Sequence, residues 1–256
     1  MIDFDAIKRK LQKLNRQSNR QDVIWKPTGE HVIRLVPKQP DPFIERFFYY
    51  FLPVGGGAVS PGFTFGKPDP IKELAEKLRN EGTEEGRNQA RTLAPKLRVY
   101  APIIVRGEED KGVRLWGFGR RVYESLLNTI LDGDFKDITD PLEGNDIKVK
   151  FTKVTQSGFP DTTITVRPKT SKLCDNEAKA EEWMNNIPDI DTLYELKSYE
   201  ELSGLLNQWL SGANADNGAP EGTRKTNGTV NHDADGIDDV AGTSEIDNAF
   251  SNLLNS

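Results

Sequence analysis

The sequence predicts a mainly β fold with added α-helix (class α+β), arranged as a small antiparallel barrel with helical insertions. Short strand-like runs follow one another between residues 32 and 167, and two helix-like stretches interrupt them. From residue 212 the chain becomes rich in Asn, Gly, Asp and Thr, with little to bury before Ile237. These observations predict a folded core followed by a flexible acidic tail.

Six runs have the length and composition of β-strands. They are residues 32–36, 46–52, 97–105, 113–118, 147–154 and 162–167. In the fifth run, apolar residues from Ile147 to Phe151 alternate with Lys148 and Lys150. A period of two is typical of a half-buried antiparallel strand, so we expect these lysines on its open face.

Helical patterns fill most of the remaining core sequence. Asp69 and Pro70 open the first helical insertion, at about residues 69–95, and an apolar stripe predicts a second helix from Val122 to Leu131. Ser198 and Glu201 have the spacing of a capping box ahead of a leucine-rich helix. The expected organisation is a basic N-terminal arm (1–22), a core (23–172), an acidic helical segment packed on the core (173–211) and the tail (212–256).

The charge is divided along the chain. Residues 1–172 hold 30 Lys and Arg against 23 Asp and Glu, whereas residues 173–256 hold 4 against 17. The net charge of −6 would by itself argue against a polyanionic partner. A basic body joined to an acidic end restores that possibility.

Catalytic and metal-site motifs are poorly represented. The chain has two histidines, His31 and His232, and one cysteine, Cys174, which excludes an internal disulfide framework and a cysteine-based zinc site within one chain. No phosphate-binding loop or nucleophile elbow is present. We therefore expect a protein that is not an enzyme. The lack of a long apolar run or a secretory signal indicates no membrane partner and a cytoplasmic location.

Two neighbouring strand runs carry the pattern expected of a single-stranded nucleic-acid site. Alternation places Arg98 and Tyr100 on the second face of the run 97–105, and Arg114 and Trp116 on that of the run 113–118. Guanidinium groups contact phosphates and flat rings stack on unpaired bases. In the alternative interpretation, the rings cover a core edge and the arginines are solvated.

Other basic and aromatic residues could extend this site. Arg120 and Arg121 follow Trp116 directly, and Lys148 and Lys150 lie on the open strand face described above. Tyr49 belongs to the aromatic run 47–51, whose two faces the sequence does not assign.

The chain resembles the single-stranded DNA-binding, helix-destabilising replication proteins of T4-type bacteriophages. Several motifs, in order, carry the resemblance: Lys8-Arg9-Lys10, Val32-Ile33-Arg34-Leu35-Val36-Pro37, Trp116-Gly117-Phe118-Gly119-Arg120-Arg121-Val122, Glu143-Gly144 before Ile147-Lys148-Val149-Lys150, Gly158-Phe159, Lys197-Ser198-Tyr199-Glu200-Glu201-Leu202 and Leu253-Leu254-Asn255.

The resemblance implies a five-stranded OB-fold barrel that binds single-stranded DNA cooperatively and without sequence preference. By position, Trp116 matches a DNA-stacking tyrosine, Phe159 a DNA-contacting phenylalanine and Tyr100 an aromatic residue of the cleft, while Arg120 and Arg121 match basic groove residues. Lys8, Arg9 and Lys10 match the cluster that contacts the next molecule on DNA. The acidic tail would recruit phage replication and recombination proteins and compete with DNA, inside an infected bacterial cell.

The sequence departs from this family at a structural zinc site. The T4 protein holds zinc with one histidine and three cysteines, but the corresponding stretch here, residues 63–71, contains neither residue type. We therefore expect no zinc and no other cofactor, with apolar packing of the helical insertion in its place. Two other functions remain open: a replication scaffold or adaptor that works through its acidic end, and an RNA-binding OB protein.

Overall fold

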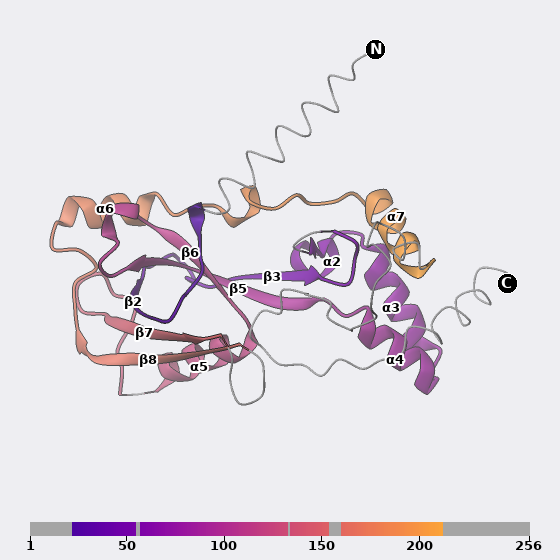
Figure 1. The fold of residues 1–256 in the computed structure, drawn as a ribbon, viewed down its shortest axis with the longest axis horizontal. Coiled ribbons are helices and arrows are strands. Elements are labelled where there is room, and N and C mark those ends of the chain that lie inside the picture. The colour runs from indigo at the N-terminus through magenta and orange to yellow at the C-terminus, as the bar shows by residue number, and fades with distance from the viewer. Residues whose placement is uncertain (1–21, 55–56, 133, 154–159, 212–256) are drawn as a thin grey trace, which may run out of the picture. The chain divides into compact units, whose positions relative to one another are not determined.

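The computed structural model describes residues 22–54, 57–132, 134–153 and 160–211. This part of the chain forms eight strands and six α-helices, which confirms the predicted α+β class (Figure 1). Lys8, Arg9 and Lys10 of the predicted N-terminal arm lie outside the described residues, as do Phe159 and the acidic tail. No described helix is long and apolar enough to span a bilayer.

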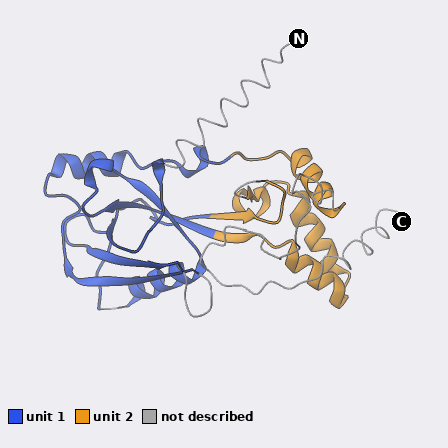
Figure 2. Cartoon of the chain, in the orientation of Figure 1, with its two compact units in different colours: residues 1–45, 98–194, 231–236 blue, residues 46–97, 195–230, 237–256 orange. Residues whose placement is uncertain are grey.

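The chain divides into two compact units, coloured separately in Figure 2. Their described parts are residues 22–45 and 98–194 for unit 1, and residues 46–97 and 195–211 for unit 2. The sequence-based division differs, because it joined residues 173–211 into one acidic segment. In the structure that segment is shared between the units.

Unit 1 is built on a sheet of six strands in the order β1-β6-β5-β2-β7-β8. The strands are β1 (Ile24–Trp25), β2 (Glu30–Leu35), β5 (Lys96–Val105), β6 (Arg114–Phe118), β7 (Asn145–Thr152) and β8 (Asp161–Thr170). All neighbours along this path pair antiparallel except β1 and β6, which pair parallel. The antiparallel pairing agrees with the sequence analysis, while closure into an OB-fold barrel stays a prediction.

Helices α5 (Arg120–Leu131) and α6 (Glu177–Asn185) pack within the same unit. Helix α5 buries Val122 and Leu126. Helix α6 buries Ala180 and Trp183 in a cluster with Ile104 of β5. Because Ile104 lies on the face of β5 that the alternation left open, α6 converts that face into core.

A buried arginine fastens the loop before β7. Arg34, fully buried in β2, donates to the carbonyl oxygens of Ile138, Asp140 and Asn145. Burial lowers the pKa of its guanidinium to about 10. Gly144 is needed here, since a Cβ atom would lie 2.1 Å from Nη2 of Arg34.

Unit 2 is mainly helical. Strands β3 (Ile44–Tyr49) and β4 (Ala58–Val59) pair antiparallel, with Tyr49 opposite Ala58. The helices are α2 (Pro61–Phe65), α3 (Pro70–Asn80), α4 (Glu84–Thr92) and α7 (Tyr199–Leu210). The predicted cap at Asp69 and the capping box of Ser198 and Glu201 are both present.

The core of unit 2 joins residues that are far apart in the sequence. Leu78 of α3, Leu93 after α4 and Leu202 of α7 share one buried cluster with Tyr49. Helix α3 lies beside both α4 and α7 (Figure 1). The helical insertion is thus supported by apolar packing, as expected, but it begins earlier, at α2, which the sequence analysis did not predict.

Candidate nucleic-acid interface

Three of the four side chains expected on an open strand face are buried, so that expectation is wrong for them. Trp116 is 1% exposed, Tyr100 4% and Arg114 8%. The physical reason is that other parts of the chain cover this face. Trp25 packs on Trp116, Tyr194 lies against Tyr100, and Glu108 pairs with Arg114. An alternating pattern marks an open face only where no other element packs on it.

Trp116 packs among other rings of unit 1. Its ring centroid lies 4.6 Å from that of Phe118 and 6.0 Å from that of Trp25. Trp25 belongs to β1, which pairs with β6 so that Trp25 and Trp116 are partners. The side chain expected to stack on bases is therefore part of the protein core in this structure.

Tyr100 and Arg98 are engaged with β6 and the later chain. A Cβ atom on Gly117 would lie 2.8 Å from the Tyr100 ring, so the absence of a side chain allows this close packing. The Tyr100 hydroxyl lies 2.5 Å from that of Tyr194. Arg98, half-buried, donates through Nη2 to the carbonyl oxygen of Gly117 at 3.3 Å.

Arg114 forms an ion pair at the start of β6. Its Nη2 atom lies 2.8 Å from Oε2 of Glu108, and the same oxygen accepts from Lys111. These two cations lower the pKa of the Glu108 carboxyl, chiefly through the hydrogen bond from Lys111. With its head group paired and buried, Arg114 stabilises the turn before β6.

The open face of β7 carries cations, as predicted. Ile147 and Val149 are fully buried, whereas Lys148 is half-exposed and Lys150 exposed. Nζ of Lys148 lies 2.7 Å from Oε1 of Glu30. That hydrogen bond is the main reason why the pKa of Glu30 is lowered, and the charges of Lys150 and Arg167 act in the same direction.

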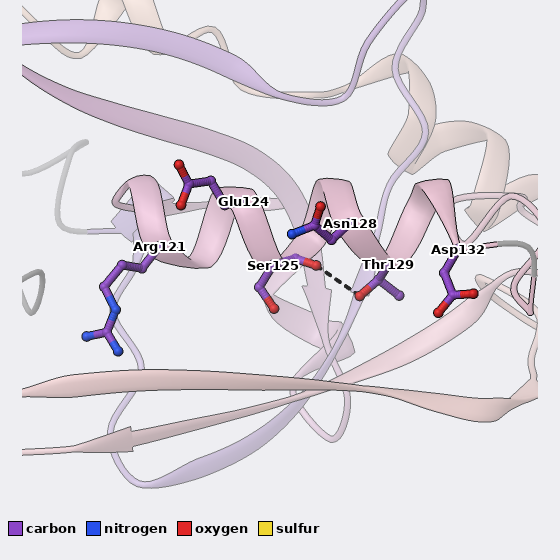
Figure 3. A pocket seen from close by; sticks show the side chains of 6 residues that line it. All are labelled: Arg121, Glu124, Ser125, Asn128, Thr129 and Asp132. Carbon is purple, nitrogen blue, oxygen red and sulfur yellow. Dashed lines mark hydrogen bonds between the residues drawn. The ribbon is translucent and has the colours of Figure 1, made fainter.

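Arg120 and Arg121 project from the first turn of α5 and are exposed. Nε of Arg120 lies 2.6 Å from Glu124, and Nη1 of Arg121 lies 3.3 Å from Asp161 of β8. Figure 3 shows the groove along this helix, from Arg121 at one end to Asp132 at the other. The groove has a volume of about 480 Å³ and mixed charge, and no ring lines it.

Tyr49 is buried in unit 2, where it takes part in a polar cluster centred on Asp69. Oδ2 of Asp69 accepts from the hydroxyls of Tyr49 and Ser60, at 3.0 and 2.7 Å, and from the backbone N–H of Gly62 at 3.0 Å. Burial is the main cause that raises the pKa of the Tyr49 hydroxyl. The aromatic run thus places Tyr49 in the core.

Asp69 lies in the stretch 63–71, where the resemblance implies a zinc site. Oδ1 of Asp69 accepts from the N–H groups of Ile71 and Lys72, so both oxygens already serve hydrogen bonds. Residues 63–71 offer no cysteine or histidine. In the described part of the chain, no group of three potential metal-ligating side chains lies together. These residues do not fit a zinc ion.

Residues 27–210 match the family described as gp32 DNA binding protein like. The chain belongs to this family. A comparison with curated proteins finds no match. The gp32-like assignment covers both units and identifies a DNA-binding protein, in agreement with the resemblance drawn from the sequence.

Several side chains of this gp32-like chain were missed by sequence reasoning. Arg167 lies on β8 two residues from Thr165, the partner of Lys148, and so continues the cationic face of β7. Alternation of Thr163, Thr165 and Arg167 with apolar residues was the available signal. The other group is aromatic: Phe63 and Phe65 of α2 are among the exposed large apolar side chains.

Proposed function

We propose that the protein coats single-stranded DNA cooperatively and without sequence preference, protects it and removes its secondary structure. In this role it supports phage DNA replication, recombination and repair inside the infected bacterial cell. The match of residues 27–210 to the gp32-like DNA-binding family carries the proposal. Binding is stoichiometric, and no catalytic step is assigned to any residue.

The cations of unit 1 supply phosphate contacts in this proposal. Lys148, Lys150 and Arg167 gather on β7 and β8, while Arg120 and Arg121 stand at the start of α5. Exposed cations neutralise phosphates and release counterions, which gives affinity without sequence preference. Arg98, Tyr100, Arg114 and Trp116 reach DNA only if the residues that pack on them or pair with them move.

The ends of the chain complete the proposal. Lys8, Arg9 and Lys10 of the N-terminal arm contact the neighbouring molecule on DNA and make coverage cooperative. The acidic tail competes with DNA for the cations and recruits replication and recombination proteins. The core is an OB-fold that works without zinc or another cofactor, and apolar packing holds its helical insertion.

Fluorescence anisotropy of labelled oligo-dT tests the proposal, with oligo-U as the RNA control, each at two salt concentrations. A labelled oligonucleotide is preferable to tryptophan quenching, because Trp25, Trp116 and Trp183 are buried. We expect binding to oligo-dT whose affinity falls with salt, with a slope of about −0.7 per neutralised phosphate. Absence of oligo-dT binding would refute the proposal, and a preference for oligo-U would favour the RNA-binding alternative.

A further inference from the structure

Helix α2 carries a group of aromatic and cationic side chains that no predicted site included. We infer that the rings of Phe63 and Phe65, with the cations of Arg46, Lys67 and Lys72, form a base-stacking platform for single-stranded DNA on unit 2. This inference rests on the proposed function and locates one of its contact surfaces.

The two rings are unusually exposed for phenylalanine. Phe63 is 38% exposed and Phe65 39%, although Phe side chains are normally buried in the core. The half-buried ring of Phe47 lies beside Phe63, with centroids 5.8 Å apart, and extends the aromatic surface. A flat apolar surface of this kind can stack on unpaired bases of any sequence.

Cations surround these rings. The guanidinium carbon of Arg46 lies 5.3 Å from the centroid of Phe65, and Nζ of Lys67 lies 5.5 Å from the same centroid. Nζ of Lys72 lies 5.3 Å from the centroid of Phe63. A phosphate beside a stacked base would therefore meet a positive charge, the combination that non-specific single-strand sites use.

Charge also favours a polyanion over a basic or neutral partner surface. Asp69 is the one carboxylate between residues 60 and 72, and it is buried and saturated with hydrogen bonds. The exposed charge of residues 60–72 is therefore positive, and of its cations Lys72 also lies 3.9 Å from the exposed Glu76, so Lys67 is the better phosphate contact. A polyanion with unpaired bases matches both the rings and the cations.

The platform is held rigidly by the Asp69 cluster. The Ser60 hydroxyl caps α2 by accepting from the Phe63 N–H at 3.2 Å, and it donates to Asp69. Thr64 accepts from the Phe47 N–H at 3.1 Å, which fastens α2 to β3. Since a Cβ on Gly62 would lie 2.8 Å from Cβ of Asp69, glycine lets α2 sit directly on the cluster. Pre-organised rings lose little entropy on binding.

Tyr199 provides a matched control within the same unit. Its side chain is 40% exposed, as much as either phenylalanine, but its hydroxyl donates to Glu73 at 2.7 Å. Glu200 is its neighbour in the chain. Carboxylates beside the ring repel a phosphate. We therefore expect no DNA contact at Tyr199, although its side chain is exposed.

The test compares the wild type with Phe63→Ala, Phe65→Ala, the double variant and Tyr199→Ala in full-length protein, using anisotropy of fluorescein-labelled oligo-dT. Base stacking lost with one ring corresponds to an increase in Kd of about fivefold or more. We expect that increase for each phenylalanine variant, a larger one for the double variant, and no change for Tyr199→Ala. Lys67→Gln should also make the salt slope about 0.7 shallower.

Thermal melting of each variant separates loss of binding from loss of folding. If an alanine variant unfolds, Phe63→Leu and Phe65→Leu keep apolar bulk without a flat ring, and the same increase in Kd is expected of them. Photocrosslinking with an oligonucleotide containing 5-iododeoxyuridine should then label the peptide with residues 61–65. Wild-type affinity in folded phenylalanine variants overturns the platform, whereas failure of the wild type to bind oligo-dT overturns the proposed function itself.

Discussion

Trp116 illustrates how much of a side chain's role depends on its surroundings. Its residue type and its spacing along the strand are those of a stacking ring, and the resemblance pointed the same way. In the structure its ring is among the largest fully buried side chains and contacts Trp25 and Phe118. Trp116 therefore contributes first to stability, through apolar area removed from water.

We expect Trp116→Ala to lower the free energy of unfolding by about 3–5 kcal/mol, the usual cost of removing a buried Trp side chain. Urea unfolding measures the change. Leu142→Ala is the control, because Leu142 is exposed, and its free energy of unfolding should change by less than about 0.5 kcal/mol. Unchanged stability of Trp116→Ala together with weaker DNA binding would show instead that this ring is available to bases.

Asp69 acts at the residue scale by accepting five hydrogen bonds while it is buried. Asparagine in its place would point its side-chain NH₂ group at N–H and O–H groups that themselves donate hydrogen bonds. We expect Asp69→Asn to reduce the free energy of unfolding by about 1–3 kcal/mol, the cost of unsatisfied buried polar groups. Thermal or urea unfolding checks this value.

The same measurement distinguishes the polar cluster from a metal site. EDTA should leave the unfolding curve of the wild type unchanged, because the cluster holds α2 by hydrogen bonds alone. A fall in stability on adding EDTA, restored by zinc, would show that the chain keeps the metal of the family it resembles.

At the scale of elements, sequence patterns predicted the features that depend on residues close together in the chain. The capping box of Ser198 and Glu201 fixed the start of α7, and the alternation from Ile147 to Phe151 identified both the strand β7 and its open lysine face. Asp69 with Pro70 likewise marked the start of α3. Each of these patterns depends on residues within one turn or one strand.

Long-range packing explains what the sequence could not predict. The covered face of β5 depends on Trp183 of α6, about 80 positions along the chain from Ile104, and no local pattern encodes that contact. Helix α2 was missed because five residues containing Pro61 and Gly62 have no helical periodicity. The exposed rings of α2 were therefore left out of the candidate site.

At the scale of the whole molecule, the uneven charge along the chain corresponds to exposed cations on the folded core. The chain carries a net charge of −6, yet residues 1–172 carry an excess of seven positive charges, and exposed cations are found on β7, β8 and α5. A protein that contacts phosphates with cations and unpaired bases with rings favours single-stranded DNA, which exposes both. Linkage then requires that single-strand binding destabilise duplex DNA.

The most direct test of preferential single-strand binding is the melting of an AT-rich DNA duplex in the presence of the protein. At concentrations that saturate oligo-dT, we expect a lower duplex melting temperature, with an effect that shrinks as salt is raised. A duplex melting temperature that is unchanged or raised under those conditions would contradict it.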